Sequence, residues 1–250
     1  MPQQAKSTTN WFDRGGRSYA QFRPTYPADL APWLAGLAPD RGLAVDVGCG
    51  NGQLTTRLAA HFDRVTGIDP SADQLANAAG DARIDYLCAP AERLPLPDGC
   101  ASLITAAQAA HWFDLPAFYA EARRIAKPGA VIALISYGVL ELASEPLHQR
   151  FIRFYRDEIG PYWPPERGLV DSGYAGIAFP FDELDAPALA IRLNWDFDAF
   201  LGYLSTWSSL RKAQEAGRPD IAEAFIQDLS GLWTQPVAVT WPINMRVGRI

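Results

Sequence analysis

The sequence predicts an α/β fold in which helices cover both faces of a mostly parallel sheet. Short apolar segments alternate with amphipathic segments five times in about 95 residues. The apolar segments are nearly continuous, as strands buried on both faces require. The segments between them repeat apolar residues at helical spacing. A chain of 250 residues is long enough for one large domain with an appended part.

The elements of the first half follow from local patterns. Residues 28–38 form an expected helix, because Leu30, Leu34 and Leu37 have helical spacing. Ser71 and Gly80 are the expected N-cap and terminator of one further helix. Strands are expected at residues 43–48, 64–69, 84–89, 100–107 and 129–136, and further helices at residues 53–62, 71–80 and 115–127.

The pattern changes after residue 136. Neither an internal repeat nor a low-complexity linker separates the second half from the first, so an elaboration of one domain is expected rather than a separate domain. The expected elements are a helix at 141–160, a proline-rich loop at 160–168, a strand at 189–195, helices at 197–216 and 220–232, and a last strand at 236–248.

Composition narrows the functional classes. A net charge of −6 provides no basic surface for nucleic acid, and the longest apolar runs are too short to cross a bilayer. The N-terminus lacks the apolar core of a signal peptide. The three cysteines, Cys49, Cys88 and Cys100, form no C-x-x-C pair, which favours a reducing, cytoplasmic location. We expect no metal site and no membrane or nucleic-acid partner, and the oligomeric state is not predicted.

The most informative stretch is "VDVGCGNGQL", residues 45–54. Gly48, Gly50 and Gly52 lie between a strand and a helix, where glycine lets the backbone approach a ligand closely. A dinucleotide fingerprint, G-x-G-x-x-G, would need a glycine at Gln53, which argues against a dinucleotide. Asp69, at the tip of the next strand, can bind the hydroxyls of a ribose. The alternative for Asp69 is an acid that stabilises a helix N-terminus.

Four segments, "VDVGCGNGQ", "VTGIDPS", "APAERLPLPD" and "ARRIAKPGAVIAL", resemble the ordered motifs of class I methyltransferases that use S-adenosylmethionine (SAM). The resemblance covers residues 40–137. It implies a Rossmann-like, mostly parallel seven-stranded sheet with helical additions after the fifth strand. It also implies a single domain over residues 1–250, with an N-terminal lid and helix at 1–38, a SAM-binding core at 39–137, and an acceptor-pocket elaboration with the last strands at 138–250.

The same resemblance implies roles for individual residues. Gly48 and Gly50 would face the methionine part of SAM, Asp46 would help hold its amino group, and Asp69 would bind the ribose. Ala91 and Glu92 would flank the adenine, although Pro90 stands where many relatives have an aspartate. Cys49 is interpreted as a small buried filler. The expected cofactor-binding set is completed by Tyr19, Arg23, Cys49, Asn51, Gln53, Pro70 and Gln108.

A narrower resemblance rests on "YAQFRPTYP", "AAQAAHWFDL" and "FLGYLSTWSSLRKA". These segments are similar to the trans-aconitate methyltransferase-like branch of the type 11 methyltransferases, which implies O-methyl transfer to a small acid. Tyr19, Phe22, Arg23 and Tyr26 would form a lid whose rings suit a sulfonium. The alternative is a surface arm packed on the edge of the sheet.

The acceptor decides whether a base is needed. A carboxylate is already ionised at neutral pH, whereas a phenol or alcohol benefits from a base, for which His111 is the candidate. His111 can equally be a structural or pocket-lining residue. Arg153, Arg156, Arg211 and Arg246 are candidates for an anionic acceptor, or else surface charges. The expected substrate-contacting residues are Tyr26, His111, Trp112, Tyr137, Trp163 and Trp207.

The predicted function is therefore SAM-dependent methyl transfer to a small molecule, as O-methylation of a carboxylate or hydroxyl. The first alternative is a SAM-binding regulatory or interaction module without catalysis, since fold alone does not separate binding from turnover. The second is a dinucleotide oxidoreductase, which Gln53 disfavours.

Overall fold

Nine strands form one sheet in the computed structural model, which describes residues 22–250. Their order is β3-β2-β1-β4-β5-β9-β6, and β7 and β8 also pair with β9. The strands are β1 (Leu43–Val47), β2 (Arg64–Asp69), β3 (Ile84–Cys88), β4 (Ala101–Ala107), β5 (Ala126–Tyr137), β6 (Glu141–Leu142), β7 (Asp182–Glu183), β8 (Ala190–Trp195) and β9 (Val237–Arg249).

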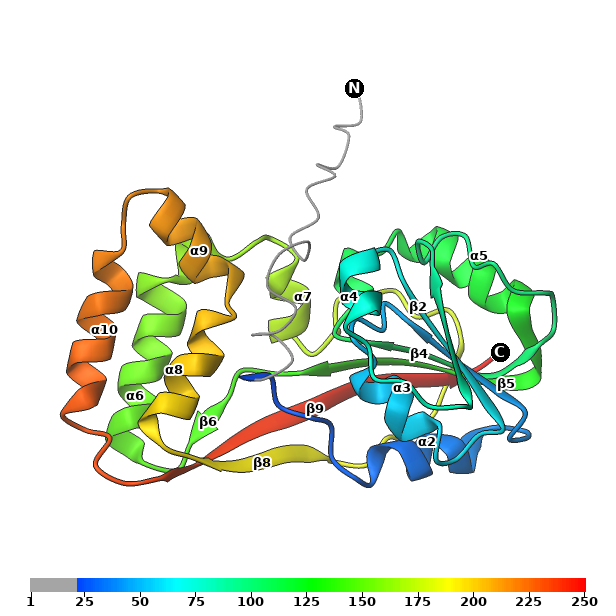
Figure 1. The fold of residues 1–250 in the computed structure, drawn as a ribbon, viewed down its shortest axis with the longest axis horizontal. Helices are drawn as coiled ribbons and strands as arrows, with labels where there is room; N and C mark the ends of the chain where they lie inside the picture. The colour runs from blue at the N-terminus through cyan, green and yellow to red at the C-terminus, as the bar shows by residue number, and fades with distance from the viewer. Residues whose placement is uncertain (1–21) are drawn as a thin grey trace.

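Helices lie on both faces of the first five strands and form a second group at one end of the sheet (Figure 1). The α-helices are α2 (Leu30–Leu37), α3 (Gln53–Leu58), α4 (Ala72–Ala76), α5 (Leu115–Ile125), α6 (Glu145–Arg153), α7 (Arg167–Asp171), α8 (Phe197–Ser205), α9 (Ser208–Glu215) and α10 (Asp220–Ser230). Short 3-10 turns are η1 (Ala110–Trp112) and η3 (Gly160–Tyr162), and η2 (Phe154–Glu158) is a π-helical turn.

The predicted parallel sheet is confirmed for β1 to β5, which pair in parallel with one another. The switch in strand order falls between β1 and β4, because successive connections run outward in opposite directions from this pair. Seven of the nine strands have five residues or more, which matches the expected seven-stranded sheet. The other two, β6 and β7, are two-residue pairings along β9 that no sequence period marks.

Two hydrophobic cores cover the two faces of the sheet. Val131, Ala133 and Ile135 of β5 belong to one core, and Ile132 and Leu134 belong to the other, as the alternation of a strand requires. The first core contains α2 and α3 and continues without interruption into the second group of helices. We call β1–β5 with α2–α5 the sheet lobe, and α6, α8, α9 and α10 the helical lobe.

Strand β9 joins these two lobes. Residues 243–249 of β9 pair antiparallel with β5, and residues 237–242 of the same strand pair with β8. In Figure 1 the red strand runs across the width of the molecule from the helical lobe to the sheet lobe, with α7 between the two. The sheet therefore continues from the sheet lobe, through β9, to β8 beside the helical lobe, and its backbone hydrogen bonds set the relative position of the lobes.

Several expected helices are shorter or interrupted. Helix α4 begins after Ser71, whose hydroxyl accepts from the Gln74 N–H as predicted, but it ends at Ala76 and not at Gly80. The side chain of Asn77 donates to the carbonyl of Asp73 at 2.8 Å. Such side-chain bonds to the backbone compete with the helical ladder. The helix expected at residues 53–62 ends at Leu58.

The second half departs further from expectation. The helix expected at residues 141–160 begins only at Glu145, because Glu141 and Leu142 pair with β9. The helix expected at residues 197–216 is two helices, α8 and α9. Trp207 has an extended backbone between them, and the hydroxyl of Thr206 donates to the carbonyl of Tyr203 at 2.6 Å. Of the helices within residues 22–250, none combines the length and the apolar character that a bilayer crossing needs.

Trp241 tests the contribution of β9 to stability. Its side chain is fully buried, its ring lies 4.9 Å from that of Trp195, and its Nε1 donates to the hydroxyl of Tyr203 at 3.3 Å. We expect Trp241→Ala to lower the free energy of unfolding by about 3–5 kcal/mol, measured by urea denaturation. The control is Leu232→Ala, because Leu232 is 45% exposed. This control should cost less than about 1 kcal/mol. Equal losses in the two variants would contradict this role.

Candidate active site

The glycine corner connects β1 to α3 at the carboxyl edge of the sheet. Gly48 and Gly52 have φ angles of 69° and 85°. This region of backbone conformation favours glycine. The N–H of Gly48 donates to the carbonyl of Ile68 at 2.7 Å, which ties the corner to β2. A methyl group on Gly48 would overlap the Cβ of Ala109, and one on Gly52 would overlap the hydroxyl of Tyr86. Both glycines are therefore required by close packing.

Gly50 also has a positive φ, of 54°, but its surroundings are less closely packed. The nearest atom to a methyl group placed there would be Oε1 of Gln74, at 3.9 Å. This oxygen is buried and accepts no hydrogen bond within residues 22–250. A buried acceptor without a donor costs stability unless a ligand supplies one. The corner thus combines accessible backbone with an acceptor that has no donor within residues 22–250, which fits the amino and hydroxyl groups of an adenosyl ligand.

Asp46 ties three elements together behind this corner. Thr55 of α3 and Thr105 of β4 each donate a hydroxyl to its carboxylate at 2.7 Å, one to each oxygen. The side chain is 1% exposed. Burial, and to a smaller extent the charge of Asp69, raises the pKa of Asp46 to about 6 against the lowering effect of the two hydroxyls. Asp46 therefore holds the corner in place, in addition to the predicted role toward the cofactor.

Asp69 lies at the end of β2, next to the corner. Its carboxylate accepts from the N–H of Gly50 at 2.9 Å and from the N–H of Ser71 at 2.8 Å. Burial raises its pKa, and these two backbone bonds oppose that rise. Asp69 thus contacts the glycine corner through Gly50 and the N-cap of α4 through Ser71. These contacts are compatible with both roles considered for it, as a ribose-binding acid and as an acid that stabilises a helix N-terminus. The predicted ribose contact stays a prediction.

The remaining predicted cofactor residues surround the corner. Cys49 fills the space above Gly67, and burial raises its thiol pKa, consistent with a filler and not with a nucleophile. Asn51 and Gln53 are half-buried, and Pro70 is exposed. Ala91 is buried, whereas a carboxylate oxygen of Glu92 accepts from the N–H of Asp114 at 2.8 Å, just before α5.

Gln108 joins the ends of β4 and β5. Its backbone has a φ of 55°. Such a value is rare for a residue with a Cβ and often accompanies functional sites. Its side-chain amide donates to the carbonyl of Tyr137 at 3.1 Å. The hydroxyl of Tyr137 accepts from Arg23 at 3.0 Å, and the Arg23 guanidinium lies 5.4 Å from the ring centre of Tyr203 in the helical lobe. These contacts form a bridge from the cofactor edge to the helical lobe.

His111 lies in the η1 turn that follows Gln108. Its Nδ1 is 3.0 Å from the hydroxyl of Tyr174, a fully buried residue with a φ of 64°. Burial lowers the pKa of His111 to about 3, and the charge of Arg167 acts in the same direction. A histidine with so low a pKa is uncharged at neutral pH and accepts protons weakly. This favours the base-free alternative over catalysis by His111.

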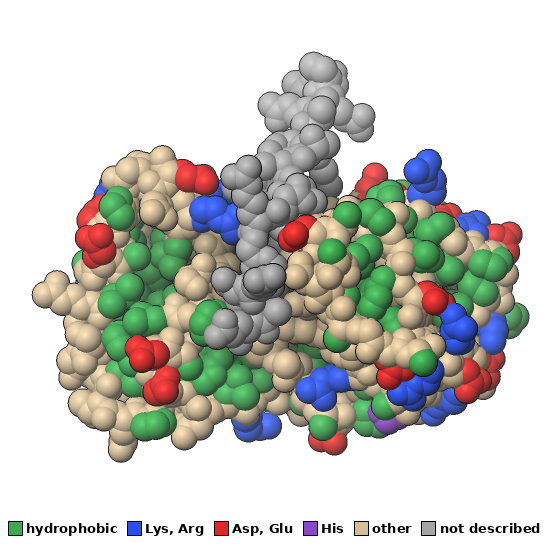
Figure 2. Space-filling model, in the orientation of Figure 1, with side chains coloured by type: hydrophobic (Ala, Val, Ile, Leu, Met, Phe, Trp, Pro, Cys, Tyr) green, Lys and Arg blue, Asp and Glu red, His purple; other side chains and the backbone are tan. Residues whose placement is uncertain are grey.

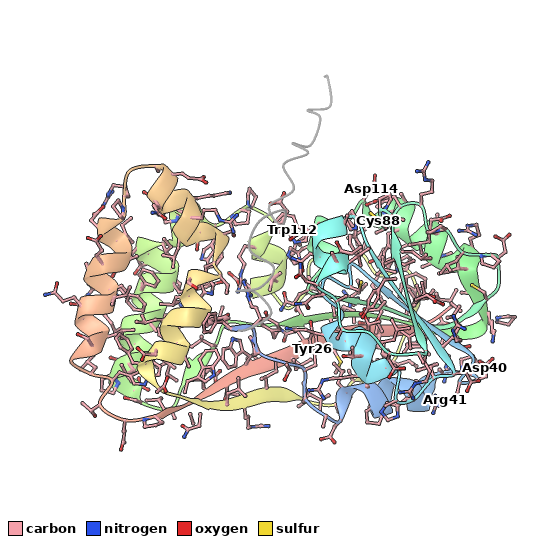
Figure 3. All side chains as sticks on the ribbon, in the orientation of Figure 1. Tyr26, Asp40, Arg41, Cys88, Trp112 and Asp114 are labelled. Atoms are coloured by element: carbon pink, nitrogen blue, oxygen red, sulfur yellow. The ribbon has the colours of Figure 1, made fainter. Side chains whose placement is uncertain are left out.

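The predicted substrate residues fall into two groups. Figure 3 shows Tyr26 and Trp112 on the side of the sheet lobe that faces the helical lobe, with Asp40 and Arg41 at the opposite end. The Tyr26 ring lies 6.4 Å from that of Tyr137. Trp207 is only 3% exposed and packs inside the helical lobe against Trp163, at 5.0 Å. Trp207 is thus a core residue here, and Tyr19 lies outside the described residues.

Within the described part of the chain, the four arginines that were candidates for binding an anionic acceptor form no hydrogen bond or ion pair with the glycine corner. Arg153 is 66% exposed on its side chain and pairs with Glu158 at 3.0 Å. Arg246 pairs with Glu183 and donates to the carbonyl of Ile177 at 3.0 Å. Arg156 and Arg211 are exposed. Arg153, Arg156 and Arg211 thus match the alternative of surface charges, whereas the side chain of Arg246 is only 20% exposed.

Sequence reasoning missed several residues of this region, namely Thr55, Gln74, Thr105, Arg167 and Tyr174. Thr55, Gln74 and Thr105 lie in segments that the sequence correctly assigned to helices or a strand. Periodicity identifies such an element, but it does not show that one of its polar side chains points toward the corner. Arg167 and Tyr174 follow a proline-rich loop, where no period indicates which side chains point inward.

The buried carboxyl of Asp46 makes stability depend on pH. Its pKa is about 6 in the folded chain and about 3.8 when unfolded, so the folded state binds more protons between these values. The stabilisation is complete below about pH 4 and is lost as the pH rises through about 6, by about 3 kcal/mol at most. Asp46→Asn should remove this dependence. Urea denaturation from pH 4 to 8 measures it as the difference between the two proteins, and parallel curves would contradict the assignment.

Comparison with known proteins agrees with this geometry. A family model described as a methyltransferase domain matches residues 45–134. A solved structure from Anaeromyxobacter dehalogenans, provisionally assigned as a type II methyltransferase, is 44% identical with a TM-score of 0.82, covering 91% of this chain and 98% of that one.

Two curated relatives add to this finding. A protein of Dictyostelium discoideum, provisionally assigned as a methyltransferase, is 35% identical over 82% of this chain and 79% of its own length. A malonyl-[acyl-carrier protein] O-methyltransferase of Pectobacterium atrosepticum is 35% identical over 49% of each chain. With its parallel sheet, its glycine corner and these relatives, the chain belongs to the class I methyltransferases, enzymes that use S-adenosylmethionine as cofactor.

Proposed function

We propose that this enzyme methylates a small-molecule acceptor, by O-methylation of a carboxylate or hydroxyl. The observation that carries the proposal is the bridge from Gln108 through Tyr137 and Arg23 to Tyr203, which brings the helical lobe to the carboxyl edge of the sheet. Residues 138–250 would then add acceptor contacts to those of Tyr26, His111 and Tyr137, and most cofactor contacts would come from residues 39–137. On the face shown in Figure 2, acidic and basic side chains are intermingled over the sheet lobe, as suits a small acceptor better than a polyanion.

The residues at the corner have complementary tasks in this proposal. Gly48, Gly50 and Asn51 present backbone to the methionine part of SAM, and Asp69 accepts from the ribose hydroxyls. When bound, SAM supplies a methyl group on a positively charged sulfur, which keeps the electron pair of the broken bond as the acceptor oxygen takes the carbon. Alignment and exclusion of water are then the main contributions of the protein.

A carboxylate acceptor is already ionised at neutral pH and needs no proton transfer. The low pKa of His111 leaves it uncharged, so it can line the acceptor site and accept a hydrogen bond without repelling a cation. The relative that acts as an O-methyltransferase matches only half of the chain, so its support extends to methyl transfer to oxygen and not to its acceptor. A non-catalytic SAM-binding module is the alternative that a transfer assay tests.

The deciding experiment for the proposal is a transfer screen with radiolabelled SAM over small carboxylic acids, phenols and amines. Label in the extracted small molecules supports the proposal, and label in an oxygen ester or ether supports O-methylation. Tight SAM binding without label in any of these acceptors would instead support the module without catalysis. Label confined to amines would contradict O-methylation alone.

Asp69 provides a test of cofactor binding. We expect Asp69→Ala to weaken SAM binding by about 10-fold or more in calorimetry, because a bond to a charged acceptor contributes about 1.5–3 kcal/mol. Asp85→Ala is the matched control, since Asp85 lies on the next strand, is 55% exposed, and pairs with Arg64. SAM affinity should be unchanged in that variant. An unchanged affinity in Asp69→Ala would show that the ribose assignment is wrong.

A further inference from the structure

Arg167 is held firmly between the two lobes. It begins α7, which lies between the lobes in Figure 1, and its side chain is 17% exposed. Its Nε donates to the hydroxyl of Tyr155 at 2.8 Å and to Asp171 at 2.9 Å. The Tyr155 hydroxyl in turn donates to the same Asp171 oxygen at 2.7 Å. This triangle fixes the guanidinium through one nitrogen.

The other end of the guanidinium is available. Both hydrogen bonds that Arg167 makes to residues 22–250 involve Nε, so its two terminal nitrogens donate to no acceptor there. These nitrogens carry four N–H groups in the plane of the fork. Asp171 is bound only on the Nε side, so it balances the charge of Arg167 without occupying the fork.

A second unpaired donor lies against the first. The Arg167 guanidinium stacks on the Trp163 ring, with its carbon 4.8 Å from the ring centre. The indole N–H of Trp163 is buried and reaches no acceptor within residues 22–250. The charged Arg167 guanidinium and the buried indole N–H of Trp163 are thus two adjacent donors, and neither group has an acceptor for its remaining hydrogens within residues 22–250. A planar carboxylate has the geometry to accept from the guanidinium fork and from a neighbouring N–H.

This cluster adjoins the reaction edge of the sheet. Helix α7 packs against the η1 turn that contains His111, and the charge of Arg167 contributes to the lowered pKa of that histidine. The hydrogen bond between His111 and Tyr174 ties that turn to the chain just beyond α7. Because His111 is uncharged, Arg167 supplies the positive charge beside it.

We propose that Arg167, together with the indole N–H of Trp163, binds a carboxylate of the methyl acceptor, so that the enzyme selects small organic acids. The inference rests on the proposed function and names the substrate class of its acceptor site. Arg167 acts here as a specificity-determining residue. Tyr155 and Asp171 are positioning residues, since they act by holding its guanidinium.

The test measures binding of carboxylates and their neutral counterparts to protein saturated with S-adenosylhomocysteine. Calorimetric titrations compare benzoate with benzamide, cinnamate with cinnamamide, and succinate with succinamide. The wild type should bind at least one acid ten-fold more tightly than its amide. Arg167→Gln should lose at least ten-fold in affinity for that acid, keep its affinity for the amide within two-fold, and keep its affinity for S-adenosylhomocysteine.

Two variants guard the interpretation. Arg153→Gln removes a positive charge from an exposed site in the helical lobe and should change neither affinity. Trp163→Phe keeps the ring stack, removes the N–H, and should lower affinity for the acid by about ten-fold or more, because the lost bond is one to a charged acceptor. If thermal melting shows that Arg167→Gln is unfolded, Trp163→Phe replaces it as the test of the proposal.

The outcomes separate the two proposals. Failure of the wild type to bind S-adenosylhomocysteine or SAM would contradict the cofactor assignment and the proposed function. Cofactor binding without a preference for any acid over its amide would overturn the role of Arg167 alone. Equal losses for acid and amide in Arg167→Gln would also overturn it, because they would indicate a merely structural residue.

Discussion

The pairing of β9 with both β5 and β8 is the constraint on which the rest of the structure depends. One half of this strand completes the sheet that carries the glycine corner, and the other half holds β8 beneath the helical lobe. Because backbone hydrogen bonds set register, the lobes cannot shift along β9 without breaking the ladder. The bridge from Gln108 to Tyr203 and the position of α7 both rely on this fixed relation. The site between the lobes is therefore built on strands and not on a hinge.

The charges around the site are arranged asymmetrically. Two carboxylates, Asp46 and Asp69, are buried near the corner, and each has a raised pKa. Such a pair favours a ligand that carries positive charge, as SAM does through its sulfonium and amino groups. Near His111, the donors of Arg167 and Trp163 that meet no acceptor within residues 22–250 favour a negative group. Opposite preferences at these two places would orient donor and acceptor before any proton moves.

The sequence predicted the sheet lobe well because its elements repeat strong local signals. Strand β2 has the expected bounds, and Ser71 caps α4 as expected. Residues at strand ends, such as Asp69 and Gln108, could be placed at one edge from parallel topology alone. The break between α8 and α9 at Trp207 and the start of α6 could not be predicted from the sequence. Helical periodicity is overridden by long-range packing at Trp207 and by the pairing of β6 with β9 before α6. The sequence did not identify Arg167 as a site residue, because a single arginine in a proline-rich loop belongs to no repeating pattern that would indicate its orientation. Only the fold brings it beside His111.

The place of β9 in the chain has a consequence for biosynthesis. The strand follows every other described element, so a ribosome completes β1 to β5 and the helical segments before it supplies the partner of β5. Until then one long edge of an apolar strand stays unpaired, and such edges promote association between chains. Contacts so distant in sequence also form slowly. The nascent polypeptide therefore passes through an interval in which chaperone protection of the β5 edge matters most.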